Sequence, residues 1–521
     1  MGEEKERIKI AETAIALSVI SIISVFISFF KESVIAYYYG ASAYTDAYNI
    51  SVDTPKIVFT FISMAISTVV IPIYTKTMVE SGREKASYFF RNFTSIVFIS
   101  YLTLTFVSEI LASFIIKILA PGLNADISYL TIILFRITLP AIGLGLFCKI
   151  NTGVLNSHKS FLLPSMAAIL FNISMCFCVI TFVRKFGIYA ATIGTVIGMI
   201  LEVLFTSCLR RKYVSYKPVL NFHDKASIIA LKMAGPVFVG MSATEINLIV
   251  DKIIASFFEA GSISVLNYAS KLSSGMSTLF IASITTVIFP ELTEYVANGK
   301  KEEAAKTYIF SIKTFILLLV PIIVGGIFLS REIMTLVYGR GKFDSTAISI
   351  TVPVFVCYFI SLLFIGLRQV GTDFLYSHGD SKEAMKNTII GVCINIILDI
   401  VLSKIMGVTG LAFATTISIA VISILLMRAA KRKNKYINYK KCWLLLFQIC
   451  IACCIMLIVE FMFKNWMVFH QFYNINNTKN TIFFTIGALL IGIIIYLLAL
   501  FLLKVEEIYY ILNIFKRKIK H

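Results

Sequence analysis

The sequence predicts an all-α membrane protein of about fourteen transmembrane helices, arranged as two six-helix lobes followed by two C-terminal helices. The first observation is composition: 58% of the 521 residues are hydrophobic, only 15% are charged, and the mean hydropathy is +0.86. A chain this apolar has the lipid bilayer as its solvent. The second observation is that short motifs recur in the same order in the two halves of the chain.

Apolar runs long enough to cross the roughly 30 Å hydrocarbon core of a bilayer place the helices. In the first half they fall at residues 11–38, 54–74, 89–117, 128–155, 161–182 and 187–209. In the second half they fall at 228–257, 264–292, 308–330, 348–376, 384–403 and 408–427, and the last two at 442–463 and 481–503. Glycine and proline inside these runs predict kinks, because neighbouring helices and water can satisfy the freed backbone groups; these residues are Pro55, Pro140, Gly143, Gly145, Pro164, Pro236 and Pro353.

The internal repeat predicts how the two halves are related. The motif TVVIP from Thr68 matches TVIFP from Thr286, LNSH from Leu155 matches LYSH from Leu375, and GIYAAT from Gly187 matches GLAFAT from Gly410. Six helices per half is an even number, so both halves have the same orientation and are related by an axis along the membrane normal. We therefore expect substrate to bind between the lobes.

The repeat and the connectors together predict the domain boundaries. The expected parts are an N-lobe at 1–209, a basic cytoplasmic linker at 210–227, a C-lobe at 228–427, a second basic linker at 428–441, and two helices with a basic tail at 442–521. We expect the protein to be a monomer.

The distribution of charge predicts the orientation. The chain has 48 Lys and Arg against 29 Asp and Glu, a net charge of +19, and the basic residues are concentrated in alternate connectors and at both termini. By the positive-inside rule both termini lie in the cytoplasm, and the charge is not a sign of nucleic-acid binding. The N-terminus mixes acidic and basic residues before a full-length apolar run, which predicts a retained first helix in the cell membrane rather than a signal peptide.

The sequence contains no recognised enzyme motif. It has no Walker A loop, dinucleotide-binding glycine motif or HExxH, and its five histidines are scattered among connectors and ends. The ten cysteines lie in or beside apolar runs without zinc-ligand spacing, so we interpret them as packing residues. We expect no catalytic residue and no bound nucleotide, which leaves a secondary transporter or a flippase.

Several lysines within the spans are candidates for substrate binding. Lys31 and Lys56 lie in the first two spans and Lys271 opens a later one. Ionisable groups in such helices usually face a water-filled interior or a partner, so cations between the lobes would attract a phosphate-bearing substrate. The alternative is snorkelling from a helix end, the interpretation we favour for Lys117, Lys232 and Lys313. We expect that Glu32 does not neutralise Lys31, because adjacent helical residues point apart.

A set of oxygen-bearing side chains predicts a cation site. Asn395 and Asp399 are four residues apart and therefore share one helix face, Thr415 lies in the next span, and Asp251 adds a second carboxylate. Such oxygens suit a hard cation such as Na⁺. The alternative is a polar clamp that only joins helices.

Four segments together resemble the lipid II flippase family MurJ, also called MviN, within the superfamily of multidrug and polysaccharide exporters. They are KESVIAYYYGASAYTDAY from Lys31, TGVLNSHKSFLLPSMAAILFN from Thr152, INLIVDKIIASFFEAGSISVLNYASKL from Ile246 and LVYGRGKFD from Leu336. The resemblance covers most of residues 12 to 430.

The resemblance implies roles for particular residues. Family members place arginines in a central cavity to meet a pyrophosphate, and Lys31 and Lys271 stand at matching positions without the bidentate fork of arginine. Two further family arginine positions are lost, at Val25 and at Phe59 or Thr60, and Lys56 lies one turn before the second. Glu32 and Asp46 match family acidic positions. The family sodium site maps onto Asp251, Asn395, Asp399 and Thr415, with the backbone carbonyl of Leu411.

We therefore expect a flippase that moves a polyprenyl-diphosphate-linked cell-wall precursor, lipid II, across the cytoplasmic membrane by alternating access. Its partners would be the lipid-linked oligosaccharide and membrane lipids, with no nucleic acid and no cofactor beyond a bound Na⁺. The missing arginines leave open a flippase for another lipid-linked oligosaccharide, such as a capsule, O-antigen or teichoic precursor. A membrane scaffold of the same fold that does not transport is the alternative from another class.

Overall fold

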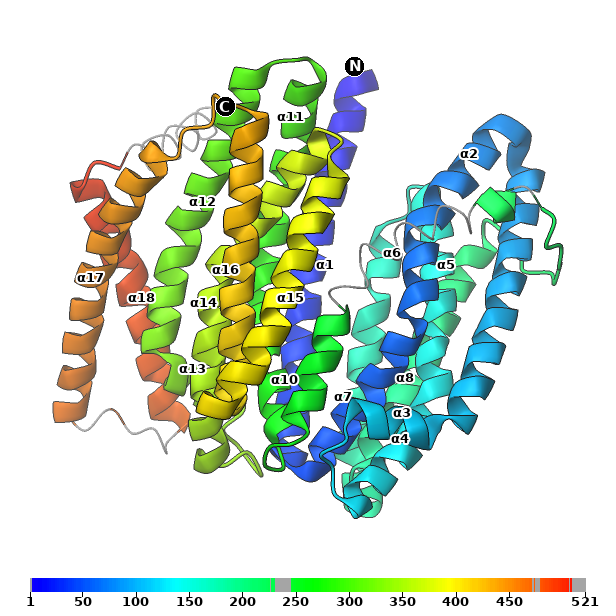
Figure 1. Ribbon diagram of the computed structural model, residues 1–521, viewed down its shortest axis with the longest axis horizontal. Coiled ribbons are helices and arrows are strands. Elements are labelled where there is room, and N and C mark those ends of the chain that lie inside the picture. Colours follow the sequence, from blue (N-terminus) through cyan, green and yellow to red (C-terminus); the bar gives the residue numbers. More distant parts are fainter. Residues whose placement is uncertain are drawn as a thin grey trace. The chain divides into compact units, whose positions relative to one another are not determined.

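The computed structural model confirms the all-α fold class. It describes residues 2–224, 226–229, 245–470, 473, 478–505 and 507, and these residues form helices and connectors without a strand (Figure 1). Side chains are described from residue 16 onward, except at 61, 64, 65, 67–69, 287, 478 and 479. The chain divides into two compact units. Unit 1 comprises Met1–Asn267 with Gly341–Phe343, and unit 2 comprises Tyr268–Arg340 with Asp344–His521. The lobe and linker boundaries of the predicted repeat stay a prediction.

Twelve helices within the described residues are long and apolar enough to cross a membrane. Two of the fourteen predicted spans are not among them. The run 54–74 is part of the longer helix α2 (Ala43–Ile110), and the run 228–257 overlaps residues 230–244, which lie outside the described part of the chain with Pro236. The number fourteen therefore stays a prediction.

Unit 1 packs around helices α2, α4 and α8. Helix α1 (Gly2–Tyr39) contacts α6 (Leu162–Ser165) and α7 (Ala167–Phe186), which packs on α8 (Tyr189–Arg211). Helix α2 contacts α3 (Ala112–Leu119), α4 (Ala125–Gly143) and α5 (Gly145–Ser157). Residues 245–255 are also helical. The core includes the fully buried Leu134, Phe135 and Leu139 of α4.

Unit 2 packs around α14 (Ser345–Ser377) and α16 (Val408–Lys433). Helix α14 also contacts α11 (Ser283–Ala297), α12 (Lys301–Phe328) and α13 (Ser330–Val337), and α15 (Ser381–Met406) packs on α16. Helix α10 (Ser262–Ser277) begins in unit 1 and belongs to unit 2 from Tyr268 onward, where it continues through a π-helical turn, η1 (Thr278–Ala282), into α11. The final helices α17 (Lys440–Phe469) and α18 (Thr478–Leu502), orange to red in Figure 1, lie side by side and contact α12.

The helices follow the predicted spans with some differences in where they are interrupted. The connector expected at 75–88 is helical and belongs to α2, except at Gly82. There φ is 85° and the helix is interrupted. The span predicted at 128–155 breaks at Leu144 between α4 and α5, directly after Gly143. By contrast, Pro55 and Pro353 lie inside continuous helices. The glycines of the span 128–155 therefore mark a break, whereas Pro55 and Pro353 do not interrupt their helices.

Large apolar side chains cover the outer faces of many spans. Phe106 of α2 is 67% exposed and Phe447 of α17 is 65% exposed. A soluble protein rarely exposes so much contiguous apolar surface, because water would disfavour it. These faces are therefore suited to contact acyl chains.

A buried acidic residue joins α17 and α18 to the rest of unit 2. Glu332 of α13 is 1% exposed and accepts hydrogen bonds of 2.7 Å from both Lys464 Nζ and Tyr473 Oη. The Lys464 ammonium lies 5.3 to 5.8 Å from the ring centres of Tyr473, Phe328 and Phe484, a distance at which cations are attracted to aromatic faces. Both donors reach the same carboxylate oxygen, Oε1, and the Lys464 ammonium supplies the opposite charge.

Two adjacent glycines of α12 test the close packing of α12 against α14. A Cβ at Gly326 would lie 2.0 Å from the Phe359 ring, whereas a Cβ at Gly325 would meet only Met456 at 3.8 Å. We expect Gly326→Ala to lower the thermal unfolding midpoint, because overpacking costs about 1 to 3 kcal/mol. Gly325→Ala should leave the midpoint unchanged or raise it, since alanine favours the helix. Equal midpoints for the two purified variants would contradict this packing.

Candidate functional site

Lys31 and Glu32 of α1 form an ion pair, contrary to our expectation. Their Nζ and Oε1 atoms are 2.9 Å apart, and their side chains are 14% and 10% exposed. Cα–Cβ directions do not by themselves decide which charges pair, so this prediction was wrong. The lysine side chain has four methylene groups, so its ammonium can fold back to a neighbouring carboxylate. The same ammonium lies 6.0 Å from the Phe171 ring centre.

Asp46 of α2 caps the beginning of α10. It is 3% exposed and accepts hydrogen bonds from the backbone amides of Gly261 (2.6 Å) and Ser264 (2.7 Å) and from the Ser264 hydroxyl (2.5 Å). Helix N-termini stabilise anions through such unsatisfied amides. Gly261 is required here, because its φ is +97° and a Cβ would lie 2.6 Å from the Ala41 carbonyl oxygen.

Burial and hydrogen bonding act on Asp46 in opposite directions. Burial disfavours the charged carboxylate, while the donors from Ser264 and Gly261 favour it. Burial has the larger effect and raises the pKa of Asp46 from 3.8 to about 6. Asp46 is therefore ionised at neutral pH and takes up a proton on mild acidification.

Asp53 bridges two lysines, an arrangement that sequence analysis missed. Its two carboxylate oxygens each lie 2.9 Å from an ammonium, Oδ1 from Lys56 and Oδ2 from Lys252. Burial alone would raise the pKa of Asp53, but the Lys252 and Lys56 charges hold it well below its usual value. Lys56 thus forms an ion pair with Asp53. The only signal in the sequence was that Lys252, within a predicted span, required a partner.

Lys271 is exposed, whereas the positions of the second lost arginine, Phe59 or Thr60, are buried or half-buried. Lys271 lies on α10 within unit 2, and its side chain is exposed. Phe59 is 3% exposed, with its ring centre 5.9 Å from that of Tyr101, so it is part of the core of unit 1. Thr60 is half-buried and donates to the Lys56 carbonyl. Neither position carries a charge.

Unit 2 holds four of the five predicted sodium ligands on two packed helices. Asn395 (1% exposed) and Asp399 (fully buried) share a face of α15, where Asn395 Nδ2 donates to Asp399 Oδ1 over 3.2 Å. Leu411 and Thr415 are on α16, and the Thr415 hydroxyl donates to the Leu411 carbonyl over 3.1 Å. Asp251 belongs to unit 1, so its part in the site stays a prediction.

The chemistry of these donors fits a hard cation. The amide oxygen of Asn395 is buried, and no residue in the described part of the chain donates a hydrogen bond to it. A buried oxygen without a donor is costly unless it has another partner, such as a cation. Carboxylate, amide, hydroxyl and carbonyl oxygens are the ligands that such ions prefer. The sodium site and the alternative of a polar clamp both stay predictions.

A family model described as "Lipid II flippase MurJ" matches residues 35–477. The chain belongs to the MurJ family. A probable lipid II flippase MurJ of Buchnera aphidicola subsp. Baizongia pistaciae is 26% identical over 463 residues, covering 88% of this chain and 90% of the relative. Another, of Rickettsia prowazekii, is 26% identical over 415 residues, covering 78% and 81%.

Solved structures agree with membership of the MurJ family. A lipid II flippase MurJ in an inward closed conformation matches with a TM-score of 0.79 and 26% identity, covering 96% of this chain and all of that one. A multidrug transporter of the MATE family matches with a TM-score of 0.68 over 81% of this chain and 99% of its own, but is only 10% identical. The MATE likeness therefore concerns the fold alone.

The raised pKa of Asp46 predicts how stability depends on pH. The folded protein holds this proton more tightly than the unfolded chain, so the wild type should lose stability as pH rises from about 4 to about 6. A shift of about two units corresponds to about 3 kcal/mol. Asp46→Asn has no titrating carboxylate at this position and should not lose this stability. Its thermal unfolding midpoint should therefore rise relative to that of the wild type between about pH 4 and about pH 6.

The control for this measurement is Asp126→Asn, which removes an exposed carboxylate from the first turn of α4. Its midpoint should follow the wild type at every pH. If the wild type instead gains on Asp46→Asn as pH rises, the hydrogen bonds to the carboxylate outweigh the effect of burial.

Proposed function

We propose that this chain translocates lipid II across the cytoplasmic membrane. The observation that carries the proposal is membership of the MurJ family, supported over residues 35–477. The substrate is a lipid-linked diphosphate oligosaccharide, and translocation carries its headgroup past the apolar core of the bilayer. Membrane lipids surround the transporter, as its apolar outer faces require.

Lys31 is the residue to which we assign contact with the diphosphate. Its ammonium is largely buried and is neutralised by Glu32. A diphosphate carries more charge than a carboxylate, so it can compete with Glu32 for the ammonium where water is partly excluded. Binding would then keep the buried ammonium compensated, at the cost of weakening its contact with the buried Glu32 carboxylate. Lys271 stays the second predicted contact in this proposal.

Finer properties of the transporter belong to the same proposal. It moves its substrate by alternating access without chemical catalysis, and it acts as a monomer with both termini in the cytoplasm. The distribution of Lys and Arg along the chain supports this orientation. Na⁺ would bind through Asn395, Asp399, Thr415 and the Leu411 carbonyl together with Asp251, and would bias the equilibrium between states by binding one of them more tightly.

Charge at Lys31 is the first property to test, by complementation of cells depleted of their own lipid II flippase. Lys31→Gln should abolish growth, because the diphosphate loses its ammonium partner, whereas Lys31→Arg should support growth since charge is kept and a fork is gained. Lys117→Gln, which alters an exposed lysine of α3, is the matched control and should grow normally.

Near-normal growth of the Lys31→Gln/Lys271→Gln double variant would defeat the assignment of these lysines. If the unaltered chain fails to complement but rescues a capsule or teichoic flippase mutant, its substrate is another lipid-linked oligosaccharide.

Sodium binding can be measured on the purified protein without transport. A ligand that binds only the folded state raises the unfolding midpoint with its concentration. We expect NaCl to stabilise the wild type relative to choline chloride at equal ionic strength, and Asp399→Asn and Asn395→Ala to remove this difference. Asn387→Ala changes another buried asparagine of α15 and should keep it. Equal sodium-dependent stabilisation in all variants would refute the site.

A further inference from the structure

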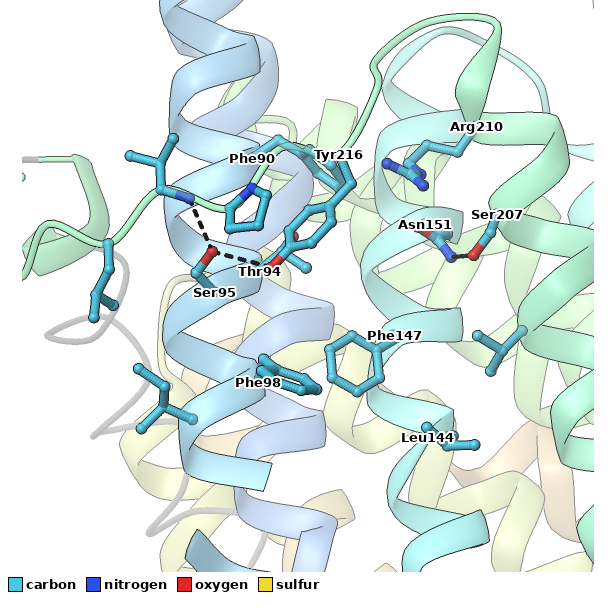
Figure 2. A pocket seen from close by; sticks show the side chains of 15 residues that line it. Phe90, Thr94, Ser95, Phe98, Leu144, Phe147, Asn151, Ser207, Arg210 and Tyr216 are labelled. Carbon is cyan, nitrogen blue, oxygen red and sulfur yellow. Dashed lines mark hydrogen bonds between the residues drawn. The ribbon is translucent and has the colours of Figure 1, made fainter. Parts of the chain in front are cut away.

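Unit 1 contains a cavity of about 650 Å³ to which neither the sequence nor the family comparison assigns a role. Its walls come from α2, the Leu144 break, α5, α8 and the segment that follows α8 (Figure 2). Apolar side chains form most of these walls. A cavity of this size is within the range of small-molecule sites, roughly 300 to 1,000 Å³.

The cavity is polar at one end and apolar at the other. Figure 2 shows Arg210, Asn151 and Ser207 near one another, and Phe98, Phe147 and Leu144 further along. Asn151 Nδ2 donates to Ser207 Oγ over 3.0 Å, so these two groups satisfy each other. The lining is therefore amphipathic, with its cation at the polar end.

Arg210 is the charged residue among the described residues that line the cavity, and no described carboxylate pairs with it. The residue is 6% exposed, and Nη1 donates to the Val214 carbonyl over 3.3 Å. Its guanidinium carbon lies 4.9 Å from the Phe90 ring centre. No described residue accepts a hydrogen bond from its buried Nε, and no carboxylate in the described ranges forms an ion pair with it. A buried cation in this state is costly.

The segment after α8 is held against α2 and fixes one wall of the cavity. Arg91 Nε donates to the Ser215 carbonyl over 3.1 Å, and the Tyr216 and Ser95 hydroxyls are 3.1 Å apart. The backbone amide of Asn221 donates to Asn92 Oδ1 over 2.6 Å. This wall is therefore formed before any ligand binds, although sequence analysis assigned Ser215, Tyr216 and Asn221 only to a linker.

The edge of the cavity is apolar and exposed. Phe98 is 43% exposed, Ile99 39% and Leu220 50%. Phe98 and Ile99 lie in a helix of membrane-spanning length and hydropathy. An apolar edge on such a helix suits entry from the bilayer rather than from water.

We propose that this cavity binds a membrane lipid with an anionic headgroup. A phosphate oxygen of the lipid would accept the hydrogen bond that Arg210 Nε lacks, and an acyl chain would lie along Phe98, Phe147 and Leu144. Arginine is suited to phosphate because its planar fork matches the phosphate oxygens. A soluble anion would leave the apolar walls without a partner, so charge and apolarity together favour a lipid. The proposal does not rest on the transported substrate.

Three probes distinguish the lipid from its parts, using the purified full-length protein in detergent. They are dioleoyl phosphatidylglycerol, dioleoyl phosphatidylcholine and glycerol 3-phosphate, measured by the shift of the thermal unfolding midpoint and by retained adducts in native mass spectrometry. The anionic lipid should stabilise the protein and remain bound. If phosphatidylcholine is equally effective, binding is not specific for an anion, and if glycerol 3-phosphate is equally effective, the site binds a soluble anion; either result overturns the proposal.

Two pairs of variants locate the binding. Arg210→Gln should weaken binding of phosphatidylglycerol about tenfold or more, since hydrogen bonds to charged groups are worth about 1.5 to 3 kcal/mol. Arg211→Gln removes a neighbouring exposed charge that does not line the cavity and should bind normally. Val203→Trp should fill the cavity and block binding while Arg210 is kept, whereas Leu204→Trp alters the adjacent exposed position and should not.

Arg210→Gln also removes the bond to Val214 and can impair folding, in which case the Val203 and Leu204 pair decides alone. Normal phosphatidylglycerol binding by a folded Arg210→Gln or Val203→Trp variant would overturn the proposal.

Discussion

Removing a charge from water is the constraint on which the described structure depends. Three buried or partly buried acidic groups lie where donors or opposite charges meet them. Asp46 caps a helix, Asp53 bridges two lysines, and Glu332 accepts from Lys464 and Tyr473. These contacts also join segments that are far apart in the sequence. Compensation of charge and tertiary packing are therefore achieved by the same residues.

The same constraint connects the structure to transport of an anionic lipid. A transporter for a diphosphate requires cations in a region with little water, yet those cations must be compensated when substrate is absent. In the proposed function the Lys31–Glu32 pair would meet both requirements, with Glu32 as the partner of the ammonium when substrate is absent. A lysine lacks the bidentate fork of arginine but carries the charge that this proposed exchange requires.

Arg210 does not follow this pattern, and the difference indicates a ligand. Its guanidinium has a ring and one carbonyl for partners, while Asp53 has two ammonium groups. Where a buried charge lacks compensation from the described residues, an external partner is the natural explanation. The apolar walls beside it restrict that partner to an amphiphile. A lipid held there would contact both α2 and the segment that follows α8.

The sequence by itself determined the class of the protein, the positions of most spans and the residues shared with its family, because hydropathy and helical periodicity are local properties. Asn395 and Asp399 could be placed on one face from their spacing alone. Only the tertiary structure decided which charges pair. The bonds of Asp46 to Gly261 and Ser264, and of Asp53 to Lys252, join residues about two hundred positions apart. Even the adjacent Lys31 and Glu32 were misjudged, since flexible side chains pair according to burial and not according to helix geometry.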